Sequence, residues 1–354
     1  MFFSKSHFSV LLFACALMVS SCELGDEQPS GLYQTGVFIT NEGPFGSGTG
    51  TVSYYDRDVD ALKNDIFGTE NGGATIGNVL QSLTLNNGKG YLIANNANKL
   101  VVVDPKTFKT ESSLATGLSL PRYFFHIDAN RAYITQFGTD SATSGVAVYD
   151  YTTKTIAKVI PTGKGADRIL NNTTSGGIWV TNSGGLSKDS TVAIISSTAD
   201  SVVQKIKVGL GPNSMVQDAN GDVWVLCGGY FDRVGSGKLV KIRNGAVELS
   251  FDVPKYASNL ILDKAKTTLY FLADNQIYTK DLLNFGANAP SVFLKPASAT
   301  YLYSLGFDAR TGYLWCGDAL DFKQSGAVYI IDPTTKTEKK KLTVGIAPNG
   351  FVFQ

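Results

Sequence analysis

The chain ends on VGIAPNGFVFQ (Val344–Gln354), and nearly the same phrase occurs in mid-chain as VGLGPNSMVQ (Val208–Gln217). The mid-chain copy continues through the turn DANGD into the apolar run VWVLC, whereas no further residue follows the terminal copy. The last residues therefore match the first strand of a repeating unit whose other strands lie elsewhere. We expect the N-terminal part to supply them, because GVFIT (residues 36–40) reads as the second strand of the same unit.

A β-rich run recurs along the chain at spacings of 42 to 53 residues. Its seven copies are VFITN (from Val37), YLIAN (Tyr91), YITQF (Tyr133), WVTNS (Trp179), WVLCG (Trp224), YFLAD (Tyr270) and LWCGD (Leu314). Two further strand-like runs follow each copy and one precedes it. Four short strands per unit at this period are typical of a β-propeller. The sequence predicts an all-β, seven-bladed propeller over residues 33–354, with four antiparallel strands per blade, closed where the C-terminal strand pairs with the N-terminal strands.

Composition supports a packed core and excludes one class of partner. The chain is 43% hydrophobic and 17% charged. Apart from Lys5, which lies in the expected signal segment, it carries 30 basic and 30 acidic residues. A neutral chain without a basic block argues against nucleic acid as a partner.

The N-terminus reads as an export signal. Residues 1–21 combine Lys5, a short apolar stretch and a small-residue end, which is typical of a signal peptide. Val19–Cys22 resembles the bacterial lipobox, so we expect Cys22 to be lipidated. Residues 22–32 are acidic and contain Pro and Gly, which indicates a flexible tether that resembles the surface-export signal of Bacteroidetes lipoproteins. We expect an outer-membrane lipoprotein that faces outward, with a periplasm-facing one as the second choice.

The long connections are expected on one face of the propeller. In a four-stranded blade, the loop between the second and third strands emerges beside the connection to the next blade, and five of these loops are long. Long loops on a rigid scaffold commonly carry function. They and the blade connections hold aromatic, charged and amide side chains suited to a binding surface. The candidate ligand-binding residues are Asn41, Glu42, Phe45, Arg122, Tyr123, Phe137, Tyr230, Phe231, Arg233, Tyr256, Asp318 and Phe322.

Catalytic chemistry is not indicated by any motif. His126 is the only histidine beyond the signal segment, and we expect it to have a structural role in an inner strand. A metal-dependent hydrolase of the lactonase kind would need converging carboxylates, for which Glu42, Asp167, Asp318 and Asp321 are available without a spacing that enforces convergence. We therefore expect no catalytic residue, no metal and no cofactor. Cys227 and Cys316 lie in apolar strands of different repeats and are expected to be buried free thiols.

Residues 33–354 resemble the YncE-like seven-bladed propeller lipoproteins of Bacteroidetes. The passages that carry the resemblance are GVFITNEG, TVSYYD, SLPRY leading to AYITQ, the GGY after the fifth copy, GDALDFKQSGAVYIID and VGIAPNGFVF. Within the family, the BtuG type captures cobalamin for a TonB-dependent transporter. The resemblance implies ligand capture on the loop face, and it places Asn41, Glu42, Arg122, Tyr230, Asp318 and Phe322 in shared passages.

The function we expect is binding of a bulky small molecule, with cobalamin or a related corrinoid as the candidate, for TonB-dependent uptake. Two alternatives remain open at this point. One is a protein-interaction scaffold or transporter accessory module, and the other is the metal-dependent hydrolase.

Overall fold

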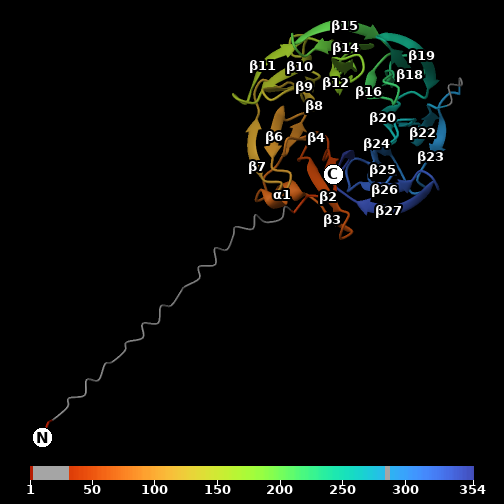
Figure 1. Ribbon diagram of the computed structural model, residues 1–354. Helices are drawn as coiled ribbons and strands as arrows, with labels where there is room; N and C mark the ends of the chain where they lie inside the picture. Colours follow the sequence, from red (N-terminus) through yellow and green to blue (C-terminus); the bar gives the residue numbers. More distant parts are fainter. Residues whose placement is uncertain (3–31, 284–287) are drawn as a thin grey trace.

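The computed structural model describes residues 1–2, 32–283 and 288–354 of the chain. Its strands form seven four-stranded antiparallel sheets, the blades, arranged around a common axis (Figure 1). Blade 1 contains β28 (Pro348–Phe353), β1 (Val37–Asn41), β2 (Thr51–Asp56) and β3 (Ala61–Lys63). Blades 2 and 3 contain β4 (Leu80–Asn86), β5 (Lys89–Ala94), β6 (Lys99–Val103), β7 (Thr110–Leu114), β8 (Pro121–His126), β9 (Arg131–Gln136), β10 (Gly145–Asp150) and β11 (Thr155–Ile160).

The remaining blades follow in the same order from the axis outward. Blades 4 and 5 contain β12 (Ala166–Asn171), β13 (Ile178–Asn182), β14 (Thr191–Ser196), β15 (Ser201–Lys207), β16 (Pro212–Gln217), β17 (Val223–Cys227), β18 (Gly237–Arg243) and β19 (Ala246–Val253). Blades 6 and 7 contain β20 (Ser258–Leu262), β21 (Thr268–Ala273), β22 (Gln276–Asp281), β23 (Ser291–Leu294), β24 (Leu302–Asp308), β25 (Tyr313–Asp318), β26 (Ala327–Asp332) and β27 (Thr337–Thr343). The predicted fold class is confirmed.

Sequence pattern explains how each blade forms. The second and third strands are almost wholly buried, whereas the outermost strands alternate or are exposed, as in β27. Asp side chains cap outer turns: a carboxylate oxygen of Asp104 accepts from the amide of Lys106 at 2.7 Å, and Asp332 accepts from the amide of Thr334 at 2.9 Å. One short helix, α1 (Ile66–Glu70), interrupts the connection from blade 1 to blade 2 and was not anticipated from the sequence.

The ring closes through the last strand of the chain. β28 pairs with β1 from Val37 opposite Phe353 to Asn41 opposite Pro348, and it forms the inner edge of blade 1. Around the axis, β28 lies between the inner strands of the two adjacent blades, β24 and β4. The C-terminus accordingly lies between the orange-red strands of blade 1 and the blue strands of blade 7 in Figure 1. The closure predicted from the repeated phrase is confirmed.

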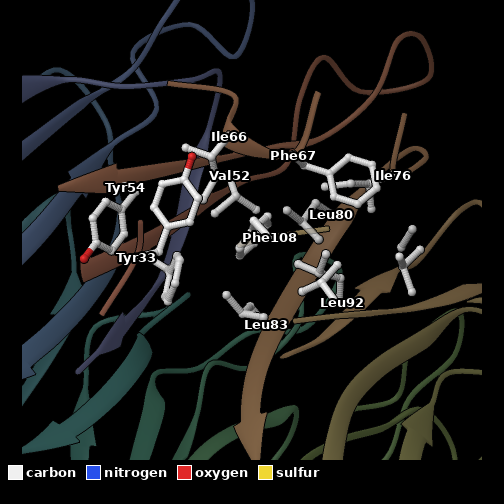
Figure 2. Packing of buried hydrophobic residues seen from close by; sticks show 14 residues of the cluster. Tyr33, Val52, Tyr54, Ile66, Phe67, Ile76, Leu80, Leu83, Leu92 and Phe108 are labelled. Atoms are coloured by element: carbon white, nitrogen blue, oxygen red, sulfur yellow. The ribbon is translucent and has the colours of Figure 1, made fainter. Parts of the chain in front are cut away.

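Apolar side chains fill the space between neighbouring blades rather than one central core. Among the described residues, seven buried clusters occur, one at each interface between blades. The cluster between blades 1 and 2, shown in Figure 2, surrounds Phe108, whose ring centroid lies 5.3 Å from that of Phe38 and 6.1 Å from that of Tyr33. Each blade is therefore stabilised by both neighbours, so opening the ring at one interface exposes apolar surface.

The long loops lie on one face, as predicted. Loops between second and third strands bond to the connections that enter their own blades: the amide of Phe137 donates to Leu120 at 3.0 Å, that of Gly184 to Lys164 at 2.8 Å, and that of Ala319 to Tyr301 at 2.9 Å. We call this side of the ring the loop face. No helix within the described residues is long and apolar enough to cross a membrane.

Candidate functional site

A cavity of about 360 Å³ opens at the axis on the loop face, and we call it the mouth cavity. All seven blades contribute to it. Its polar and aromatic lining comprises Glu42, Gln81, Arg122, Tyr123, Asp167, Arg168, Asn213, Lys255, Tyr256, Ser258, Asn259, Asp274, Asn275, Tyr301, Tyr303 and Asn349.

A β-bulge at the start of every inner strand directs these side chains. In each blade, the register between the inner strand and its neighbour shifts just after the first paired residue. Nine residues inside the shifts line the mouth cavity, whereas Leu260, inside the shift of blade 6, is buried; the nine are Asn349, Gln81, Arg122, Tyr123, Asp167, Arg168, Asn213, Asn259 and Tyr303. A bulge leaves its extra residue unpaired and can turn its side chain toward a site. Repetition of the bulge therefore builds a ring of polar groups at the axis.

On the side of blades 2 to 4, the ring is internally bonded. Nε of Arg122 lies 3.2 Å from Oδ1 of Asp167, and another of its nitrogens donates to Oε1 of Gln81. The amide of Gln81 donates to the hydroxyl of Tyr123 at 3.1 Å. The Asp167 side chain is only 7% exposed, so the ion pair neutralises a charge that would be costly to leave alone. This part of the cavity is held rigidly before any ligand arrives.

The Glu42 side chain connects blade 1 to blade 7. Its Oε1 accepts from the hydroxyl of Tyr303 at 2.9 Å and from the amide of Asn349 at 3.2 Å. Burial raises the pKa of the Glu42 carboxyl above its ordinary value of 4.5, against the opposing effect of these two donors and of Arg122. Burial and the adjacent Glu42 also raise the pKa of Tyr303, so this hydroxyl stays protonated and acts as a donor.

A family model described as "Domain of unknown function (DUF5074)" matches residues 35–344. The chain belongs to the DUF5074 family. The matched range covers β1 to β27 and leaves out the closing strand β28 of this family member.

Solved structures share the architecture of this DUF5074 protein at low identity. A quinonprotein alcohol dehydrogenase-like protein from Bacteroides thetaiotaomicron has a TM-score of 0.68 at 15% identity, over 91% of this chain and 79% of the other. The periplasmic gluconolactonase of Pseudomonas aeruginosa has a TM-score of 0.67 at 14% identity, over 90% and 98%. The hydrazine synthase of Kuenenia stuttgartiensis has a TM-score of 0.63 at 14% identity, over 78% and 90%. Likeness at this level shows the fold alone. No curated protein matches the chain.

The structure brings four of the predicted site residues together at the mouth cavity: Glu42, Arg122, Tyr123 and Tyr256. Two others lie directly behind this lining. The guanidinium carbon of Arg122 lies 4.3 Å from the ring centroid of Phe137, and the ring of Phe322 lies 5.0 Å from that of Tyr303. Phe137 and Phe322 thus support residues that face the cavity.

Three predicted residues form bonds within the framework instead. Asn41 is fully buried and donates to the hydroxyl of Ser53 at 3.0 Å. The hydroxyl of Tyr230 accepts from the amide of Asp189 at 2.7 Å and so ties together the loops of blades 4 and 5. Asp318 is fully buried and accepts from the amides of Thr300 and Tyr301 at 2.9 and 2.7 Å.

The last three predicted residues point into solvent away from the mouth cavity. Phe45 and Phe231 are 81% and 84% exposed, and Arg233 is also exposed. Cys22, the predicted lipidation site, lies outside the described residues.

Sequence reasoning did not select most of the bulge residues that line the mouth cavity, among them Gln81, Arg168, Asn213 and Asn259. A signal was present in the dipeptides that open three inner strands, Pro121-Arg122, Pro212-Asn213 and Pro348-Asn349, where a polar residue follows the same proline. A proline followed by a polar residue, repeated at the start of several inner strands, indicates the bulge.

Other residues considered for chemistry have structural partners. Nδ1 of His126 lies 2.9 Å from the hydroxyl of Tyr151 at the end of β8. Asp321 accepts from the amides of Lys323 and Gln324 and does not line the mouth cavity. Cys227 and Cys316 are buried free thiols, and burial raises the pKa of Cys227 to about 12. Within the described part of the chain, no group of three His, Cys, Asp or Glu side chains is placed to hold a metal ion.

The raised pKa of Glu42 leads to a prediction about pH. Because the native state binds this proton more tightly than the unfolded chain, Glu42 should lower stability as pH rises from the ordinary carboxyl range through its native pKa. Glu42→Gln keeps an oxygen that can accept from Tyr303 and Asn349 but cannot ionise. We expect the variant to lack this decline, so that its unfolding free energy relative to wild type increases across that pH window.

Urea unfolding at a series of pH values measures this difference. Asp321→Asn serves as the control, because its carboxylate is exposed and lies outside the cavity. A constant difference between Glu42→Gln and wild type at every pH would contradict the prediction.

Proposed function

We propose that the protein binds a small molecule in the mouth cavity. The observation that carries this proposal is the convergence of bulge residues from all seven blades on one cavity of about 360 Å³. Ligand sites commonly occupy about 300–1,000 Å³ and place a few polar groups among aromatic surfaces. Amides, hydroxyls and guanidinium groups here surround the rings of Tyr123, Tyr256 and Tyr301.

A corrinoid is our candidate ligand. Its peripheral amides suit dispersed hydrogen bonds to side chains such as Asn213 and Asn259, and its flat ring suits stacking on exposed tyrosines. A corrinoid is wider than the mouth cavity, so one edge would enter while the remainder lies across the loop face. Tyr256, which is 61% exposed at the cavity rim, is placed to contact that remainder.

We further propose that Cys22 carries the lipid anchor and that residues 22–32 tether the propeller to the outer membrane, facing outward. The support is the Val19–Cys22 pattern and the acidic composition of the segment after it. In this arrangement the protein would pass its ligand to a TonB-dependent transporter.

A protein partner is the second candidate, favoured by exposed apolar residues on the loop face. We call Phe45, Leu186, Phe231 and Val234 the apolar rim; each is at least 73% exposed. Exposed apolar groups in loops are typical of protein contact sites. The apolar rim and the mouth cavity share no residue, so a transporter and a small ligand could engage the same face together.

The test of the primary proposal is calorimetric titration with cyanocobalamin of residues 33–354, which form every blade and inter-blade cluster. We expect Tyr256→Ala to weaken binding about tenfold, or ~1.4 kcal/mol, because it removes the stacking surface at the edge of the mouth cavity. Val59→Ser is the control, since Val59 is 70% exposed in the turn between β2 and β3, on the opposite face. Absence of heat and of co-eluting colour would reject the corrinoid as ligand.

A further inference from the structure

Two arginines line the mouth cavity from neighbouring blades, and their surroundings differ. Arg122 is bonded to Asp167 and Gln81, and its guanidinium stacks on Phe137. Its charge is neutralised and its donors are directed at protein groups. Arg122 therefore has little capacity left for a ligand.

Arg168 has unused capacity. Its backbone amide donates to the hydroxyl of Thr181 at 3.0 Å, which holds the bulge that carries it. Its guanidinium carbon lies 4.1 Å from the centroid of the Tyr123 ring. Among residues 32–283 and 288–354, no carboxylate, carbonyl or hydroxyl accepts a hydrogen bond or forms an ion pair with this side chain.

The contact with the Tyr123 ring uses none of the N–H groups of Arg168 in a hydrogen bond. An aromatic ring contacts the flat face of a guanidinium, whereas the N–H groups point outward in its plane. Two parallel N–H groups match the two oxygens of a carboxylate or phosphate. Tyr123 is itself held by the amide of Gln81, so the guanidinium is oriented before a ligand binds.

The remaining charges around the cavity leave this edge without a competitor. Asp167 is paired with Arg122, and Glu42 accepts from Tyr303 and Asn349. Asp274 is exposed in the turn between β21 and β22 and makes no ion pair with Arg168. The ammonium of Lys255 donates to the carbonyl of Arg233 at 2.6 Å and adds positive potential to the same cavity.

We propose that Arg168 is an anion-recognition residue, and that the ligand of the mouth cavity carries a carboxylate or phosphate group that the edge of this guanidinium binds. This inference rests on the proposed small-molecule function and narrows its ligand class. A phosphodiester, such as the one in the nucleotide loop of cobalamin, belongs to the same chemistry. An unpaired cation in a partly enclosed polar cavity gains most from a charged partner.

The test follows the side-chain Nε–H resonances of the arginines in ¹⁵N-labelled protein, residues 33–354. The probes are inorganic phosphate, benzoate and benzamide, the last being the uncharged match for benzoate. We expect phosphate and benzoate to shift the Arg168 resonance saturably, while Arg122 and the exposed Arg233 stay unmoved. Saturation by one anion alone would identify which of the two groups the subsite prefers. Benzamide should leave all three unchanged.

Variants provide the matched comparison. Arg168→Gln should weaken the binding of the responding anion at least about tenfold, and Arg168→Lys should recover only part because an ammonium lacks the planar pair of donors. Arg233→Gln removes one positive charge from the same face and should have no effect. The proposal is overturned if Arg168 shifts no more than Arg233, or if benzamide acts as benzoate does.

These probes report on the Arg168 subsite independently of the corrinoid. If anions shift Arg168 while cyanocobalamin does not bind, the corrinoid is the wrong ligand and the subsite stands. If cyanocobalamin binds wild type and Arg168→Gln equally, the small-molecule site stands and the role of Arg168 falls.

Discussion

A chain that stops at Ala347 is expected to lose cooperative folding. Without β28, the strand β1 has an unpaired edge and blade 1 has no inner strand. The loss also removes Phe351 and Phe353, whose ring centroids lie 5.9 and 5.7 Å from that of Trp315 in blade 7. Deleting one buried aromatic side chain costs about 3–5 kcal/mol. Phe351 and Phe353 are half-buried, so each contributes less than this. Together with the lost pairing of β28 with β1, the deletion still removes a large part of the stability of a typical domain, about 5–15 kcal/mol.

Urea unfolding followed by circular dichroism, together with size-exclusion chromatography, measures this effect. The control is a rearranged chain in which residues 345–354 precede Tyr33 through a short Gly/Ser linker. Because the amide of Gln354 already donates to the carbonyl of Gly36 at 3.1 Å, the moved segment can form an ordinary hairpin with β1. The rearranged chain should fold with nearly the stability of wild type. A truncated chain with an unchanged unfolding midpoint would show that β28 does not close the ring.

The second large effect is expected from Arg57→Ala. One nitrogen of Arg57 donates to the carbonyls of Thr35 and Gln354 at 2.8 and 2.7 Å, and the other lies 3.0 Å from Asp308. The side chains of Arg57 and Asp308 are 9% and 1% exposed. Arg57 thus joins the residues just before β1, the last residue of the chain and blade 7. Removing it leaves the buried Asp308 carboxylate without its cationic partner, which costs about 3–5 kcal/mol. The amide of Arg310 and the hydroxyl of Thr311 still donate to this carboxylate.

Arg310→Ala is the matched control for this change. Arg310 reaches the same carbonyl of Thr35 at 3.3 Å and lies 3.8 Å from Asp58, but its side chain is 53% exposed. Exposed ion pairs contribute about 0–1 kcal/mol, so this variant should unfold close to wild type. Arg57→Lys should recover only part of the loss, because one ammonium cannot serve all three acceptors in this geometry. Equal losses for Arg57→Ala and Arg310→Ala would contradict the role given to Arg57.

The fold could be predicted because its information is local and repeated. Each blade has its own buried second strand, and several have an Asp-capped turn, so seven copies of one pattern indicate seven sheets. The closure followed from one comparison, that of PNGFVF with PNSMVQ. PNGFVF is an inner strand with no second strand after it, so it must pair with the N-terminal strands, which have no inner strand before them. The prediction that the long loops share one face followed from the order of the strands within a blade.

The candidate site was predicted less completely. Residue type and loop position selected Phe45 and Phe231, yet both point into solvent, whereas Arg122 and Glu42 were selected and do line the mouth cavity. Asn41 and Asp318 have side chains typical of ligand contacts, but both form hydrogen bonds within the protein. Asn41 donates to the hydroxyl of Ser53, and Asp318 accepts from the amide of Thr300. Composition cannot separate these cases, because a buried polar group and a ligand-binding one have the same chemistry.

By itself the sequence determined the number of blades, the order of their strands, the meeting of the two ends and the side that carries the long loops. Only the tertiary structure decided which side chains reach the axis. The physical reason is that strand side chains alternate from face to face, so a register shift of one or two residues at the start of an inner strand changes where each following side chain points. Arg122 and Arg168 illustrate the result: both lie in such bulges, and their three-dimensional neighbours leave one neutralised and the other open.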